Sequence, residues 1–100
     1  MIQIKPGAKV NGIQPEMLIA LMVANEVYSK YDTPCVITEG TGGKHGTGSL
    51  HYVGLAIDIR TRNIVGGKEE FIAQQIRVNL GEQYDVVLES DHIHIEFQPK

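Results

Sequence analysis

The sequence predicts an α+β domain in which a small antiparallel sheet is backed by two helices. Apolar residues recur at three- and four-residue steps in two segments, and four other short runs are rich in β-branched residues. These segments do not alternate regularly along the chain, as strands and helices do in a parallel α/β fold. A chain of 100 residues has room for one core, so we expect a single domain over residues 1–100.

The two helices are predicted from their apolar stripes and from the residues that end them. Pro15 and Glu16 suit a first helical turn, and residues 32–34 should end that helix because the residue before a proline avoids helical angles. The second helix is expected over residues 68–80, with Gly81 as its stop. The stripes are Met17, Ala20, Leu21, Ala24, Val27, Tyr28 and Tyr31 in the first helix, and Ile72, Ala73, Ile76 and Leu80 in the second.

Strands are expected over residues 35–38, 55–60, 84–88 and 92–97. In the second of these, period-two alternation puts Asp58 and Arg60 on the face opposite Ile57 and Ile59. The last two runs are separated by three polar residues, which favours a hairpin. Five glycines fall within residues 40–48, so this segment is predicted to be a loop between the first two strands.

Composition excludes some classes of function. Lys and Arg number 9 against 12 Asp and Glu, a net charge of −3, and no basic run is present, so we expect no nucleic-acid partner. The single cysteine, Cys35, lies in an apolar run and should be buried. We find no signal-peptide pattern and no apolar segment long enough to span a bilayer. We expect a monomer that is made in the cytoplasm and does not insert into a membrane.

Three of the four histidines lie in two segments that also contain acidic residues. Catalytic zinc takes three protein ligands from His, Asp, Glu and Cys and leaves one position for water. His92 and His94 would share one face of a strand, whereas His51 and Asp58 are seven residues apart and need a break in the chain, which Gly54 offers. These side chains would either close around one metal ion or serve as hydrogen-bonding and salt-bridging groups of the fold.

Two motifs carry a resemblance to a known family, and they are Ser49-x-His51-x-x-Gly54-x-Ala56-x-Asp58 and Asp91-His92-Ile93-His94. Together they closely resemble the zinc peptidases that cut D-amino-acid-containing bonds in bacterial peptidoglycan. These are the D-alanyl-D-alanine carboxypeptidases and L-alanyl-D-glutamate endopeptidases, whose metal core is shared with the hedgehog signalling domain. The resemblance covers residues 36–97 and is greatest to phage or prophage members, which are often endolysins.

The resemblance implies a role for each matching residue. His51, Asp58 and His94 would bind one zinc ion per chain, and His92 would stabilise the transition state beside the metal. The catalytic carboxylate is left open between two residues. Asp91 lies three residues before the final ligand, a spacing that some members have, and is slightly preferred; Glu89 lies near the position that other members use.

The chain also departs from the family pattern. Many members carry an arginine before the first histidine motif that contacts the substrate carboxylate or the developing oxyanion, and residues 38–45 contain none. We therefore expect Lys44 or His45 to bind substrate in its place, with the hydroxyl of Ser49 nearby. Arg60 and Arg62 are expected to orient Asp58 or to pair with surface acids, and Glu96 to form a salt bridge or face solvent.

The implied function is a zinc-dependent peptidase that hydrolyses a stem-peptide bond of peptidoglycan through a zinc-activated water. Such an enzyme would reach the cell wall through a holin, a virion or another carrier. One alternative is a zinc-stabilised wall-binding or virion structural module with weak or no activity. A third interpretation is a metal-free fold in which the histidines are structural.

Overall fold

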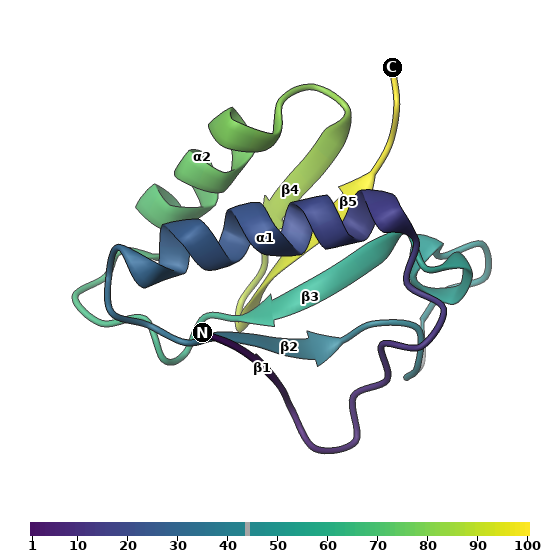
Figure 1. The fold of residues 1–100 in the computed structure, drawn as a ribbon, viewed down its shortest axis with the longest axis horizontal. Helices are drawn as coiled ribbons and strands as arrows, with labels where there is room; N and C mark the ends of the chain where they lie inside the picture. Colours follow the sequence, from purple (N-terminus) through teal and green to yellow (C-terminus); the bar gives the residue numbers. More distant parts are fainter. Residues whose placement is uncertain (44) are drawn as a thin grey trace.

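A five-stranded sheet forms the centre of the protein in the computed structural model, which describes residues 1–43 and 45–100 (Figure 1). Its strands run in the order β1-β2-β3-β5-β4. They are β1 (Ile2–Ile4), β2 (Cys35–Glu39), β3 (Ala56–Arg60), β4 (Tyr84–Leu88) and β5 (His92–Phe97). The α+β class predicted from the sequence is confirmed.

The sheet is mixed and not purely antiparallel, because β1 pairs in parallel with the edge of β2 while every other pair is antiparallel. No strand was predicted at the N-terminus. All three residues of β1 are exposed, and an apolar–polar alternation of only three residues is too short to indicate a strand. The four predicted strands are all present, with ends within one residue of those expected.

Two helices, α1 (Pro15–Ser29) and α2 (Glu69–Leu80), pack on one face of the sheet (Figure 1). Pro15 occupies the start of α1, as predicted, and α1 ends before the turn in which Asp32 has a φ of 52°. The apolar stripes of both helices meet the strand residues that point the same way, among them Ile57, Ile59, Ile93 and Ile95. None of the helices among the described residues is long and apolar enough to cross a membrane.

The opposite face of the sheet carries the polar side chains of β3 and β5. Because side chains alternate along a strand, Asp58 and Arg60 lie on the face away from the core. The register of the two strands sets Asp58 directly opposite His94, and Arg60 opposite His92. Part of this face is covered by the glycine-rich loop and by a short 3₁₀ helix, η1 (Leu50–Val53), which was not predicted as an element.

Candidate metal centre

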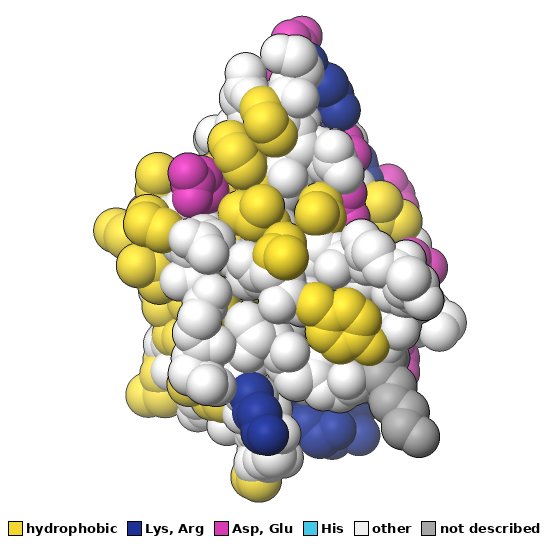
Figure 2. Space-filling view, turned by 90° about the vertical axis from the view of Figure 1, so that its right-hand side faces the viewer, with side chains coloured by type: hydrophobic (Ala, Val, Ile, Leu, Met, Phe, Trp, Pro, Cys, Tyr) yellow, Lys and Arg dark blue, Asp and Glu magenta, His cyan; other side chains and the backbone are white. Residues whose placement is uncertain are grey.

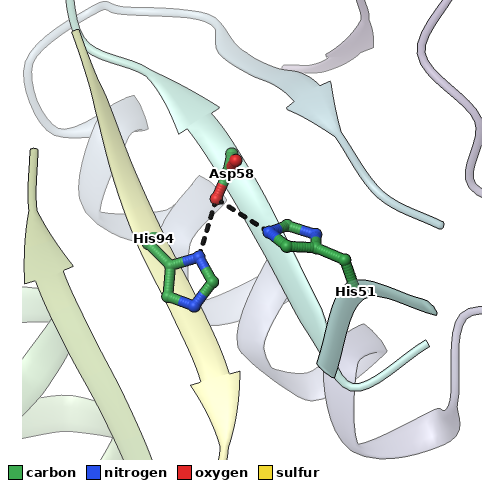
Figure 3. Close-up of side chains that lie close together, drawn as sticks. All are labelled: His51, Asp58 and His94. Atoms are coloured by element: carbon green, nitrogen blue, oxygen red, sulfur yellow. Dashed lines mark hydrogen bonds and ion pairs between the residues drawn. The ribbon is translucent and has the colours of Figure 1, made fainter. Parts of the chain in front are cut away.

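The three predicted zinc ligands come together on the face of the sheet opposite the helices (Figure 3). Asp58 projects from β3, His94 from β5, and His51 reaches over them from η1. One ligand atom from each residue lies within 4.8 Å of the other two. His51 and Asp58 are buried, and His94 is partly buried. This His/Asp/His group can hold a metal ion.

Gly54 makes this meeting possible by turning the chain between η1 and β3. It caps η1 in the left-handed conformation, with a φ of 78° that disfavours other residues. A Cβ atom at this position would lie 2.0 Å from the carbonyl oxygen of Gly12, so the space there is closed as well. The break that the sequence predicted at Gly54 is therefore present, and it brings His51 over Asp58 although seven residues separate them.

Residues 9–14 hold the loop that carries His51 in place. The carbonyl oxygen of Lys9 accepts a 2.8 Å hydrogen bond from the backbone N–H of Thr41, and a Cβ on Gly40 would lie 2.2 Å from that oxygen. At the other end of the loop, the N–H of Gln14 donates to the carbonyl of Gly54 at 2.9 Å. The end of the molecule beside η1 shows gathered apolar side chains and, among the described residues, no visible histidine (Figure 2). The side chain of His51 is only 3% exposed.

The hydrogen bonds of His51 define which of its nitrogens is available to a metal. Its Nδ1 lies 2.8 Å from the carbonyl oxygen of Gly40, and because a carbonyl only accepts, Nδ1 carries the hydrogen. Its Nε2 lies 3.3 Å from Oδ1 of Asp58, where it can donate a hydrogen or, without that hydrogen, offer a lone pair to a metal ion. Two electron-pair donors at this distance require a proton or a cation between them, which is the chemistry of a metal site.

His94 lies between two carboxylates. Its Nδ1 is 2.9 Å from Oδ1 of Asp58, and its Nε2 is 2.7 Å from Oε1 of Glu96. The hydrogen bond to Asp58 outweighs burial and, with the bond to Glu96, raises the pKa of His94 to about 9. Burial acts to raise the pKa of Asp58, but the hydrogen bonds from His51 and His94 prevail and hold that pKa well below its usual value. In the metal-free protein, therefore, His94 carries a proton on each nitrogen.

Glu96, which was expected either to form a salt bridge or to face solvent, forms a salt bridge with His94 and is therefore part of the site. A carboxylate on the outer nitrogen of a metal-binding histidine fixes the ring's orientation and increases its basicity. The available signal was parity, since Glu96 follows His94 by two residues on the same strand and so shares its face.

The two candidate catalytic carboxylates occupy different places. Asp91 is exposed and lies 2.7 Å from Nδ1 of His92, whose Nε2 is 3.7 Å from Oδ2 of Asp58. The hydrogen bond to His92 lowers the pKa of Asp91. Asp91 and His92 line a pocket of about 290 Å³ together with Asp58, whereas Glu89 lines a separate hollow that includes neither Asp58 nor His92.

Two of the residues expected to bind substrate, His45 and Ser49, contact the candidate ligand His51 instead of lining this pocket. The ring of His45 stacks on that of His51, with centroids 4.0 Å apart and planes within 10°. The hydroxyl of Ser49 accepts a hydrogen bond from the backbone N–H of His51 at 3.2 Å. Both residues therefore position His51. Lys44 lies outside the described residues. Arg60 and Arg62 line the pocket, which the sequence did not predict.

A scan of the chain against models of known protein families found no match, and a search of curated proteins also found none.

Proposed function

We propose that this protein is a zinc-dependent peptidase that hydrolyses a stem-peptide bond of bacterial peptidoglycan. The single observation that carries the proposal is the convergence of His51, Asp58 and His94 on one point. Two imidazoles and one carboxylate are a donor set typical of catalytic zinc, which leaves a fourth position for water. The spacing of the same three residues in the sequence is what resembles the peptidoglycan peptidases.

Bound zinc would supply a water of lowered pKa and would polarise the carbonyl of the scissile bond. The protein's own residues then divide the remaining work. Asp91, held ionised by its hydrogen bond to His92, takes the proton of the attacking water and passes it to the leaving amine. His92, beside Asp58, donates from Nδ1 to Asp91; in its doubly protonated form it also donates from Nε2 to the oxygen on which negative charge develops.

Asp91 is preferred to Glu89 as the base because of the pockets that the two residues line. Only Asp91 opens onto the hollow that contains Asp58 and His92. We propose either a D-alanyl-D-alanine carboxypeptidase or an L-alanyl-D-glutamate endopeptidase, acting as a phage endolysin. In both reactions one peptide bond is hydrolysed, one amine is released, and one water is consumed.

The test combines metal analysis with an assay of wall hydrolysis. We expect one zinc per chain and the release of new amino termini from purified peptidoglycan. Both should be lost in His51→Ala, Asp58→Ala and His94→Ala, while Asp85→Ala, which removes a carboxylate from β4, keeps both. Asp91→Asn should keep zinc and lose activity, and Glu89→Gln should keep both.

Other outcomes point to other functions. Zinc-loaded protein that binds peptidoglycan without releasing amino termini would make it a wall-binding or virion structural module. Protein purified without chelator that holds no stoichiometric metal would identify the histidines as structural groups. Full activity in both Asp91→Asn and Glu89→Gln would refute the assignment of the base.

A further inference from the structure

The pocket beside the candidate metal centre is lined by three cationic side chains, those of Lys5, Arg60 and Arg62. We call it the basic pocket. Asp58 and His92 form part of its wall, so it is continuous with the metal centre. Its volume of about 290 Å³ is enough for one or two small amino-acid residues of a peptide.

Two strands that are far apart in the sequence, β1 and β3, bring these cations together. Arg60 follows Asp58 by two residues on β3, and therefore shares its face of the sheet. Lys5 comes directly after β1, and its backbone N–H donates to the carbonyl of Ile37 on β2 at 2.9 Å. Arg62 follows β3 where the N–H of Thr61 bonds the carbonyl of Asp91. Only the folded chain creates this cluster, because no basic run exists in the sequence.

Among the residues that the structure describes, these three cations have no anionic partner of their own. Within residues 1–43 and 45–100, none of the three forms an ion pair, although Glu39, Asp58 and Asp91 line the same pocket. Those carboxylates face histidines instead. Asp91 pairs with His92 at 2.7 Å, and Glu39 lies 3.7 Å from Nε2 of His45. Three cations thus face three carboxylates, and a divalent metal on Asp58 would make the pocket net positive.

We propose that the basic pocket binds a carboxylate of the substrate beside the peptide bond held at the metal centre, with Arg60 and Arg62 as the specificity-determining residues. A guanidinium offers two parallel N–H groups that match the two oxygens of a carboxylate. Arg60 and Arg62 would thus bind the substrate carboxylate, the role expected from the sequence for Lys44 or His45. The inference rests on the proposed function, because the peptidase reaction defines the bond beside which the carboxylate lies.

A stem peptide offers such a carboxylate in two places, at its C-terminus and on the glutamate that is linked through its γ-carboxyl group. The probe is the peptide L-Ala-γ-D-Glu-L-Lys-D-Ala-D-Ala, made non-hydrolysable with ketomethylene groups at both candidate bonds. Three forms are compared: the free acid, the C-terminal amide, and the form whose glutamate α-carboxylate is an amide. Dissociation constants are measured by calorimetry on the zinc-loaded protein.

We expect the dissociation constant of the free acid to be lower than that of one of the two amides by about tenfold or more. A difference of this size is typical of the loss of a charge-assisted hydrogen bond. The weaker amide identifies the source: the C-terminal one for a carboxypeptidase, the glutamate one for an endopeptidase. In the double variant Arg60→Gln and Arg62→Gln this ratio should fall below about threefold. The control double variant, Lys30→Gln and Lys68→Gln, removes the same charge outside the pocket and should keep the ratio.

Equal binding of all three peptides by the unmodified protein would overturn the inference, as would a full ratio in the arginine variant. Zinc content and circular dichroism show whether each variant is folded. If the double variant does not fold, Arg62→Gln is tested alone, because Arg62 is exposed. Hydrolysis of the natural peptide is measured separately. If the free acid binds more tightly than an amide but no hydrolysis occurs, the peptidase function is refuted and the proposal for the basic pocket is supported. If hydrolysis occurs but all three peptides bind equally, the peptidase function is supported and the proposal for the basic pocket is refuted.

Discussion

Metal-free protein should lose stability as the pH rises from 6.5 to 9, because of the proton on His94. The pKa of this histidine is about 9 in the folded chain, against an ordinary value of 6.5. A raised folded-state pKa means that the folded protein keeps a proton which the unfolded chain releases. The contribution is complete below pH 6.5 and is lost as the pH passes through 9.

The size of this effect follows from the shift. Each pKa unit corresponds to about 1.4 kcal/mol, so the His94 proton contributes up to about 3 kcal/mol to the free energy of unfolding. The side chain of His94 is 21% exposed, so screening by solvent is limited. A metal ion bound to His94 would replace one of its protons, and the zinc affinity should therefore rise with pH over the same window.

The assay is urea unfolding of chelator-treated protein at pH 6.5, 7.5, 8.5 and 9.5, with the imidazole protons of His94 followed by NMR. The control is His94→Gln, which lacks the titrating group and should show a nearly constant free energy of unfolding from pH 6.5 to 8.5. A His94 that titrates near 6.5, or a wild-type stability that stays level to pH 9.5, would refute the argument from Asp58 and Glu96.

Three further predictions concern single positions. Glu96→Gln should keep the fold but weaken zinc binding by about tenfold or more, because the His94 ring loses its carboxylate; competition with a fluorescent chelator measures this. Gly54→Ala should lower the free energy of unfolding by about 2 kcal/mol or more, seen in thermal melts, since φ is 78° and Gly12 occupies the space. Burial raises the pKa of the Cys35 thiol to about 12, although the positive charge of the N-terminal amino group acts to lower it. The protonated thiol therefore stabilises the fold fully below about pH 9, and this contribution to the free energy of unfolding is lost as the pH rises toward 12. Unfolding of Cys35→Ala should lack this loss.

Much of the fold could be predicted because periodicity reports burial. Helix α1 begins at Pro15 and helix α2 ends before Gly81, as their sequences indicate, since proline and glycine restrict or free the backbone locally. Strand β1 could not be found in this way. Its three residues are exposed, and it exists only because β2 offers an unpaired edge.

The candidate metal ligands could be predicted from the sequence more completely than the residues that surround them. His51, Asp58 and His94 could be named from spacing and resemblance, because a ligand set leaves its pattern in the chain. The basic pocket leaves no such pattern, since Lys5 and Arg62 meet only after β1 pairs with β2. The contact of Glu96 with His94 lay between these cases, visible as parity but without a stated partner.

Residues 9–14, which supply no ligand, give the site a boundary different from that of its motifs. The resemblance covers residues 36–97, and a fragment with those limits would keep every metal ligand in its sequence. It would lose the carbonyl of Lys9 that holds Thr41 and the N–H of Gln14 that holds Gly54, and so the two attachments of the His51 loop. The candidate site therefore depends on a longer part of the chain than its two motifs, and substitutions between Lys9 and Gln14 should displace the His51 loop without replacing any candidate ligand.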